Sequence, residues 1–138
     1  MGYLIDTNVL SELRRKVPDD RVKRWFAGRP TAALYLSVLT LGEIRKGIES
    51  LADRPRRLVL LDWLETELPA FFAARILTID TAVADRWGRM VAHAGRPLPA
   101  IDSLLAATAA HHGLIFVTRN LRDLQGLGAE VLNPWEAR

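Results

Sequence analysis

Carboxylates recur in this sequence at points where an apolar run gives way to polar residues. Several carboxylates that pack together repel one another and raise their own pKa values. A hard divalent cation relieves that repulsion, and Mg²⁺ or Mn²⁺ prefers oxygen ligands. Beside a phosphodiester, such a site can activate a water molecule for in-line attack and neutralise the leaving oxygen. The candidate acids are Asp6, Glu43 and Asp102, and Asn120 or Asp123 is a candidate for a fourth position.

Small polar and basic side chains accompany these acids. Thr7 and Asn8 follow the first acid directly and would orient the carboxylates. Thr118, Arg119 and Asn120 follow a buried apolar run and could hold a scissile phosphate or a metal-bound water molecule. Arg54, Arg56 and Arg57 could bind phosphates, but such a cluster is more typical of a solvated helix face. Other basic residues that could contact an anionic substrate are Arg14, Arg15, Lys16, Arg45 and Lys46.

Each acid also has a purely structural interpretation. Asp6 could cap the helix that follows it, and Thr40 and Glu43 have the spacing of a capping box. Asp102 falls in the first turn of an expected helix, where the helix dipole favours an acid. Ile101 and its apolar neighbours flank Asp102, however, which indicates an inward-facing carboxylate. A buried acid needs a partner or a metal, and this favours a functional role for Asp102.

The elements that would position these residues alternate between short apolar runs and amphipathic stretches. This pattern predicts an α/β domain with a parallel sheet and right-handed crossovers. The carboxyl ends of parallel strands share one edge, where ligands bind in open sheets, so the acids are expected to meet there. A helix from Arg54 is expected to break at Pro69, and another should span 81–94. The expected strands are 3–5, 34–37, 75–79, 114–117 and 130–132.

Composition narrows the class of protein. The 138 residues are 49% hydrophobic, which suits one domain over residues 1–138. The absence of cysteine excludes disulfides and thiolate metal sites and favours a reducing, cytoplasmic location. There is no signal-peptide pattern and no apolar run of the length that spans a membrane. The net charge of +3 permits an anionic partner such as nucleic acid.

Several common kinds of site are missing from the sequence. Glycine-rich phosphate loops are absent, which argues against ATP and NAD sites. No Gly-x-Ser-x-Gly motif and no cysteine nucleophile is present. His93, His111 and His112 fall at expected helix ends, where a cationic side chain is favourable. The acids therefore remain the main candidates for chemistry.

The order of these motifs resembles that of PIN-domain proteins over essentially the whole chain. The ending Leu132-Asn133-Pro134-Trp135 is similar to that of VapC-type toxins of bacterial toxin–antitoxin pairs, in the FitB-like branch. The other motifs that carry the resemblance are Leu4-Ile5-Asp6-Thr7-Asn8-Val9-Leu10, Leu41-Gly42-Glu43-Ile44 with Lys46-Gly47-Ile48, Asp102 in a short helix, and Val117-Thr118-Arg119-Asn120.

The resemblance implies a PIN-like three-layer α/β/α domain with a central, mainly parallel sheet of four to five strands. It also implies a metal-dependent endoribonuclease that uses Mg²⁺ or Mn²⁺. Asp6, Glu43 and Asp102 would take the metal-binding positions, and either Asn120 or Asp123 would complete the site. The implied partners are RNA, a second copy of the chain, and a cognate antitoxin whose C-terminal segment occupies the active-site groove, possibly in a toxin–antitoxin hetero-oligomer.

Two other classes of function remain open. A haloacid-dehalogenase-type phosphotransferase would use Asp6 as its nucleophile, but it would need a second acid at the position of Asn8. A non-catalytic PIN-like interaction module would keep the fold and lose one of the acids. Three acids are present here, which favours the nuclease.

Overall fold

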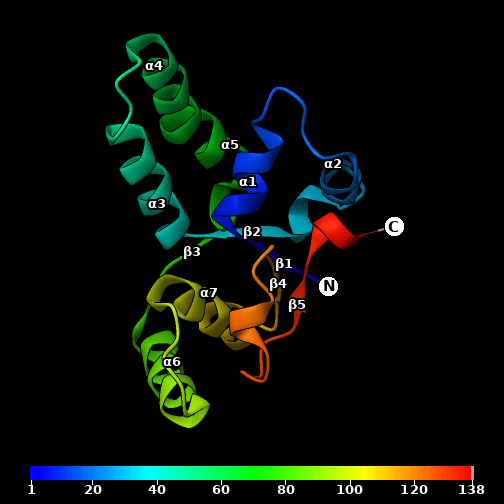
Figure 1. Cartoon of the computed structure of the whole chain (residues 1–138), viewed down its shortest axis with the longest axis vertical. Coiled ribbons are helices and arrows are strands. Elements are labelled where there is room, and N and C mark those ends of the chain that lie inside the picture. The colour runs from blue at the N-terminus through cyan, green and yellow to red at the C-terminus, as the bar shows by residue number, and fades with distance from the viewer. Residues whose placement is uncertain (138) are drawn as a thin grey trace.

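The computed structural model describes residues 1–137 and shows three layers, with a sheet between two groups of helices (Figure 1). The strands are β1 (Tyr3–Ile5), β2 (Leu34–Ser37), β3 (Ile76–Leu77), β4 (Ile115–Val117) and β5 (Val131–Leu132). The helices are α1 (Thr7–Leu13), α2 (Asp20–Ala27), α3 (Val38–Glu49), α4 (Arg54–Asp62), α5 (Leu68–Phe72), α6 (Thr81–Ala94) and α7 (Ala100–His111).

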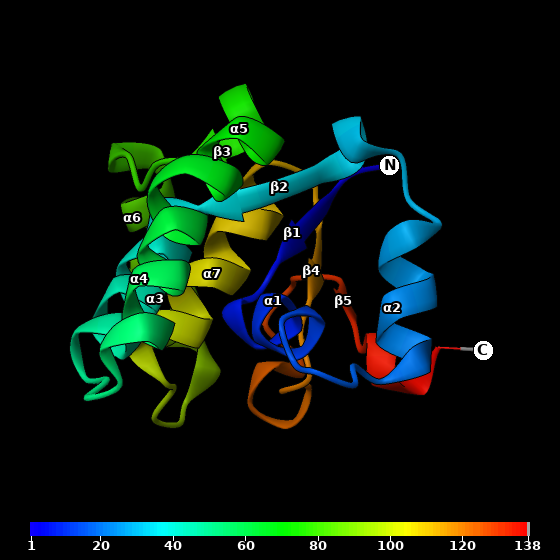
Figure 2. The ribbon, with the colours of Figure 1, turned by 90° about the horizontal axis from the view of Figure 1, so that it is seen from above.

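The five strands form one parallel sheet in the order β3-β2-β1-β4-β5. Helices α1 to α5 lie on one side of it, and α6 and α7 lie on the other (Figures 1 and 2). This arrangement confirms the expected α/β/α fold. It also puts β1 at the centre, because the chain goes from β1 to β2 on one side and later returns to β4 on the other.

Alternation along the strands explains why both faces of the sheet are covered. Leu4 and Phe116 point into a core shared with α7, whereas Ile5 and Val117 point into the larger core under α1, α2 and α3. Successive side chains of a strand face opposite sides of its sheet, so a strand that is covered on both faces has a continuous apolar sequence. The short apolar runs therefore become the buried central strands.

Acidic side chains begin several of the helices. Asp6 accepts a hydrogen bond from the backbone N–H of Thr7 at the start of α1, and Asp80 accepts one from Val83 at the start of α6. Asp19 and Asp53 do the same for α2 and α4. Such caps satisfy backbone donors that have no partner within the helix.

The capping-box interpretation of Thr40 and Glu43 is wrong. Helix α3 begins at Val38, and its cap is Ser37, whose hydroxyl accepts from the N–H of Leu39 at 3.1 Å. Thr40 lies inside the first turn, and its buried Oγ1 has no hydrogen-bond partner within residues 1–137. Glu43 therefore lies beyond the first turn, and its carboxylate is free for a different contact.

Two boundaries differ from expectation. The helix from Arg54 does not break at Pro69, because a π-helical turn at Trp63–Glu67 connects α4 to α5. Pro69 is the second residue of α5, which directly follows the π-helical turn, where the regular α-helical hydrogen-bond pattern is already interrupted. The expected strand at 75–79 is only Ile76–Leu77. No helix in residues 1–137 combines the length and the apolar character needed to cross a bilayer.

Candidate active site

The acids meet where the order of the strands reverses. β1 and β4 are neighbours in the sheet, and the backbone N–H of Asp6 donates to the carbonyl of Val117 at 3.0 Å. Asp6 and Thr118 thus follow the carboxyl ends of two adjacent parallel strands whose connections leave in opposite directions. Open α/β sheets bind ligands in the crevice at such a point.

An open cavity of about 600 Å³ lies over this point of the sheet. Three of the candidate carboxylates line it, and each comes from a different element: Asp6 ends β1, Glu43 lies on α3, and Asp102 lies in the first turn of α7. Its full lining is Asp6, Thr7, Asn8, Ser11, Glu12, Arg15, Glu43, Arg56, Asp102, Arg119 and Trp135. Residues far apart in the sequence thus share one site.

Asp6 is the most buried of these carboxylates, with 4% of its surface exposed. The pKa of Asp6 is raised from its ordinary 3.8 to about 6, mainly by burial and to a smaller extent by the negative charges of Asp102 and Glu43. Two hydrogen bonds oppose this rise by favouring the ionised form: Thr118 Oγ1 donates to Oδ2 at 2.7 Å, and the Thr7 N–H donates to Oδ1 at 2.7 Å. The ionised form of Asp6 is therefore energetically unfavourable in this site.

Hydroxyl and amide donors hold the other two carboxylates. Thr7 Oγ1 donates to Glu43 Oε1 at 2.7 Å, which ties α3 to the start of α1. Asn120 Nδ2 donates to Asp102 Oδ2 at 2.8 Å and to Asp123 Oδ2 at 3.2 Å. Asp102 is half-buried, but Ile101 beside it is exposed, so its apolar neighbours do not all face inward as expected.

Thr118 joins the two halves of the site. Its buried hydroxyl donates to Asp6 and accepts from Asn8 Nδ2 at 3.3 Å and from the N–H of Asn120 at 3.1 Å. Asn8 Oδ1 is buried and has no hydrogen-bond partner among residues 1–137. A buried amide oxygen without a donor is costly, and it suits a hydrated cation or a water molecule in the adjoining space.

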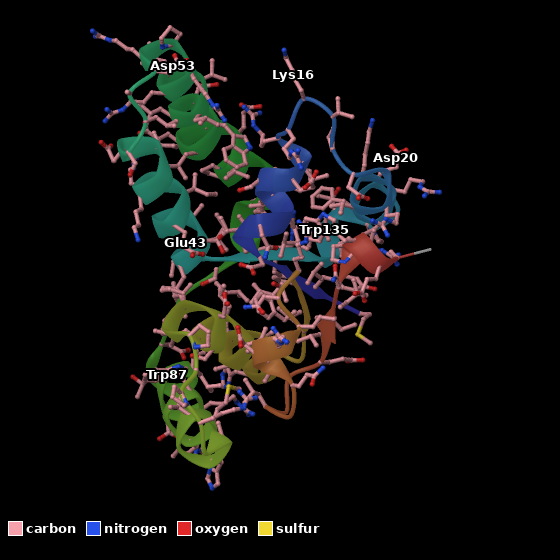
Figure 3. The ribbon with its side chains drawn as sticks, in the orientation of Figure 1. Lys16, Asp20, Glu43, Asp53, Trp87 and Trp135 are labelled. Atoms are coloured by element: carbon pink, nitrogen blue, oxygen red, sulfur yellow. The ribbon has the colours of Figure 1, made fainter. Side chains whose placement is uncertain are left out.

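Basic side chains form the rim of the cavity. Arg15, Arg56 and Arg119 line it, and the guanidinium of Arg119 lies 4.9 Å from the centre of the Trp135 ring. Trp135 belongs to the C-terminal turn and Glu43 to α3, and both are labelled in Figure 3. A cavity that is lined by carboxylates and has arginines at its rim can bind a phosphodiester.

Some candidate residues lie elsewhere. Asn120 and Asp123 do not line the cavity; the Asn120 side chain contacts Asp102, and its backbone N–H donates to Thr118. Arg45 pairs with Glu49 and Glu65, and the ring of Trp63 lies beneath Arg14 in a neighbouring groove. Neither arginine lines the cavity. The remaining candidate bases, Lys16 and Lys46, are exposed and do not line the cavity.

Sequence reasoning missed Glu12 as a lining residue, favoured a solvated face for Arg56, and used Trp135 only as part of the C-terminal motif. Glu12 is buried and accepts from the N–H of Asp19 at 3.0 Å and from Arg15. These contacts hold the pKa of Glu12 below its usual range, mainly through the Asp19 N–H. Helical spacing contained the signal, because Glu12 and Arg15 follow Asn8 by four and seven residues and so share one face of the first helical segment.

The donor set fits a hard divalent cation. Three carboxylates and an unpartnered amide oxygen surround one cavity, and oxygen donors of this kind are those that Mg²⁺ and Mn²⁺ prefer. A cation would also offset the repulsion that raises the pKa of Asp6. As the side chains lie, no three or more Asp, Glu or His residues within 1–137 form a ready-made metal cluster. The carboxylates instead accept hydrogen bonds from Thr7, Thr118 and Asn120.

Comparisons with known proteins agree with this geometry. The PIN domain family model matches residues 3–126. The chain is 33% identical to the VapC ribonuclease Y4jK of Sinorhizobium fredii over 136 residues, which cover 96% of this chain and 97% of that protein.

Two solved structures extend the match. A crystal structure of FitAcB from Neisseria gonorrhoeae superposes with a TM-score of 0.91 at 34% identity and covers 97% of this chain and 99% of its own. A toxin–antitoxin complex from Klebsiella pneumoniae superposes with a TM-score of 0.67 at 26% identity and covers 96% of this chain and 98% of its own. Sequence and fold thus agree over nearly the full length, and the chain belongs to the PIN domain family, in the branch that contains VapC and FitB.

Proposed function

We propose that this chain is a metal-dependent endoribonuclease that acts as the toxin of a toxin–antitoxin pair. The observation that carries the proposal is the convergence of Asp6, Glu43 and Asp102 on one cavity with a rim of arginines. The name of the related Y4jK protein, a VapC ribonuclease, supports RNA as the substrate.

Asp6, Glu43 and Asp102 would hold the cation, and Asn8 would face its water shell. Mg²⁺ or Mn²⁺, when bound there, supplies activation of a water molecule and neutralisation of charge at the phosphate. The chain's own task is to keep the carboxylates ionised and aimed at the cavity. Thr7 and Thr118 do this by donating hydrogen bonds to Glu43 and Asp6.

The arginine rim would position the RNA. Arg119, Arg15 and Arg56 can donate to phosphate oxygens, and a planar guanidinium binds phosphate through two parallel hydrogen bonds. The Arg119 guanidinium lies over the ring of Trp135 at the edge of the cavity, which favours that position of the cation. The scissile phosphate would thus be held between the rim and the carboxylates.

Asn120 would act by orienting Asp102 rather than as a ligand. Its amide donates to both Asp102 and Asp123, which fixes the orientation of the Asp102 carboxylate. In this proposal Asp123 supports the site from outside, and a second cation, if one is used, would arrive with the RNA. A neutral amide at position 120 is the reason for one resident cation rather than two.

An antitoxin and a second copy of the chain complete the proposal. The related structure from Klebsiella pneumoniae is a toxin–antitoxin complex, which supports a protein partner for this chain. The antitoxin's C-terminal segment would occupy the cavity and block RNA. Induced expression should then arrest bacterial growth, the Asp102→Asn variant should not, and growth arrest by both would contradict the toxin role.

The decisive experiment is digestion of total cellular RNA by the purified chain. Discrete fragments should form with Mg²⁺ or Mn²⁺ and disappear in EDTA and with the Asp102→Asn variant. Cleavage that persists in EDTA and with the Asp102→Asn variant would contradict the assignment of these carboxylates as the active site. No cleavage by folded protein free of antitoxin would favour the non-catalytic module. Hydrolysis of a phosphomonoester through a phosphoenzyme at Asp6 would instead favour the phosphotransferase.

A further inference from the structure

A second cavity, of about 280 Å³, lies away from the carboxylates. Its walls are the C-terminal half of α6, the end of α7 at Ala110, and the loop 126–128. In Figure 1 the loop, in orange, lies beside the C-terminal end of α6 below the sheet. Asp102 lines the carboxylate cavity and Ala110 lines this one, and the two residues are eight positions apart on one helix, a rise of about 12 Å along α7.

One face of α6 forms the longest wall of this second cavity. Its lining residues are spaced alternately three positions and one position apart, and this spacing places them along one side of a helix. They are Arg86, Arg89, Met90, His93 and Ala94. Met90 is half-buried and packs against the core under α7 together with Leu127, whereas the two arginines and His93 are exposed. The cavity therefore has an apolar floor and a cationic rim.

The cationic groups of this rim are available to a ligand. Arg86 makes no ion pair or side-chain hydrogen bond within the part of the chain that the structure describes. Arg89 pairs with Asp85 at 2.7 Å, but both side chains are largely exposed, so the pair is weak. His93 Nδ1 donates to the carbonyl of Arg89 at 2.7 Å, which leaves Nε2 toward other partners.

The opposite wall is a glycine loop that exposes its backbone. Gly126 and Gly128 have φ values of 77° and 79°, in the region that favours glycine, and nothing lies within 4 Å of where a Cβ would be. The guanidinium of Arg96 fixes the base of the loop by donating to the carbonyls of Asp123 and Gln125 at 3.3 and 2.8 Å. A ligand can thus approach the main chain closely.

We propose that this cavity binds one nucleotide of the RNA substrate at a distance from the cleaved bond. The phosphate would contact Arg86 and Arg89, and the base would lie on Met90 and Leu127. An apolar floor takes a base face, and a cationic rim takes the backbone, as in other single-strand binding grooves. The inference rests on the proposed ribonuclease function.

The separation of the two cavities sets the length of RNA that can reach both. A stacked strand rises about 3.4 Å per nucleotide, so 12 Å along α7 corresponds to about four nucleotides. RNA that extends fewer nucleotides than this on the relevant side of the cleaved bond would fill the carboxylate site alone. Substrate length therefore distinguishes a distant nucleotide site from a general effect of charge.

The test is an Arg86→Gln/Arg89→Gln double variant, with Lys23→Gln/Arg24→Gln as its matched control. Both pairs are exposed and remove two charges, and the control pair is on α2, across the molecule from α6 (Figure 2). Cleavage is measured on two RNAs that extend two and eight nucleotides on each side of a mapped site. For the longer RNA, the α6 variant should raise KM about three- to tenfold with kcat unchanged. For the shorter RNA and for the control, KM should not change.

Binding is measured separately, because it does not depend on cleavage. Fluorescence anisotropy with the longer RNA in EDTA should show the same loss of affinity, and the slope of log Kd against log salt should fall by about 0.7, as the loss of one phosphate contact requires. The proposal would be overturned if both variants lost the same RNA affinity, or if the α6 variant lost the same affinity for both RNAs. It would also be overturned if AMP bound to the protein without changing its affinity for RNA. If the wild type cleaves no RNA, the ribonuclease function fails, while the anisotropy result still decides whether the cavity binds RNA.

Discussion

Neutralising Asp6 should stabilise the protein while it removes activity. A buried carboxylate whose pKa is about 6 in the folded state and 3.8 when unfolded costs about 3 kcal/mol of folding free energy once it is ionised in both states. Asn keeps the shape of the side chain. Its Oδ1 can accept from the Thr7 N–H, but its Nδ2 faces the Thr118 hydroxyl, which already accepts from Asn8 and Asn120 and would lose Asp6 as its acceptor. The loss of that hydrogen bond offsets part of the gain, so we expect Asp6→Asn to add about 1–2 kcal/mol at pH 8.

The pH dependence of this difference identifies its cause. Between pH 3.8 and about 6 the folded wild type binds the proton more tightly than the unfolded chain, so its stability falls as the pH rises through that window. Below the window Asp6 is neutral in both states, and the advantage of the variant should vanish. Above the window the advantage should be constant.

The assay is urea unfolding of wild type and Asp6→Asn at pH 4, 5, 6, 7 and 8, without divalent cations. Asp62→Asn, at an exposed acid of α4, is the control and should show no such dependence. Added Mg²⁺ should stabilise the wild type more than the Asn variant, because a ligand stabilises the form that binds it. A variant that is less stable than the wild type by the same amount at every pH would refute the reasoning.

Three further substitutions test other contacts. Thr40→Val removes a buried hydroxyl that has no partner among residues 1–137 and should add about 1 kcal/mol in urea unfolding, whereas a loss of that size would show that the hydroxyl is bonded. Glu12→Gln weakens the acceptor for the Asp19 N–H and should cost about 1–2 kcal/mol at pH 7. Because the pKa of Glu12 is lowered on folding, that cost should shrink as the pH falls through the folded-state pKa, and a cost independent of pH would contradict this account. Arg119→Lys removes the guanidinium that lies over Trp135 and should raise KM for RNA about threefold or more while lowering the free energy of unfolding by no more than about 1 kcal/mol, and an unchanged KM would exclude the contact from substrate binding.

Much of the fold could be predicted because the sequence is locally consistent. Short apolar runs became parallel strands, and helix α6 has the predicted limits because Asp80 caps it and Gly95 ends it with φ of 66°. The meeting of the acids at one edge followed from the parallel order alone. For Asp6 the structural role as a helix cap and the functional role as a candidate metal ligand are compatible, since one oxygen caps α1 while the carboxylate lines the cavity.

What could not be predicted depends on contacts between distant residues. Ser37 and Thr40 are both possible caps, and only the end of β2 places Ser37 at the start of α3. The roles of Asn120 and Asp123 depend on the path of the chain after β4, where a short 3-10 helix at Arg122–Leu124 brings the two side chains together behind Asp102. Spacing alone gives no signal for that path.

Titration calorimetry with Mn²⁺ tests the central claim most directly, because it asks whether three carboxylates from separate elements form one cation site. We expect one Mn²⁺ to bind per wild-type chain. Asp6→Asn, Glu43→Gln and Asp102→Asn should each weaken binding at least about tenfold, as loss of one charged ligand requires. Asp123→Asn should change it little, because Asp123 lies outside the cavity. Binding that none of the three substitutions affects would contradict the account.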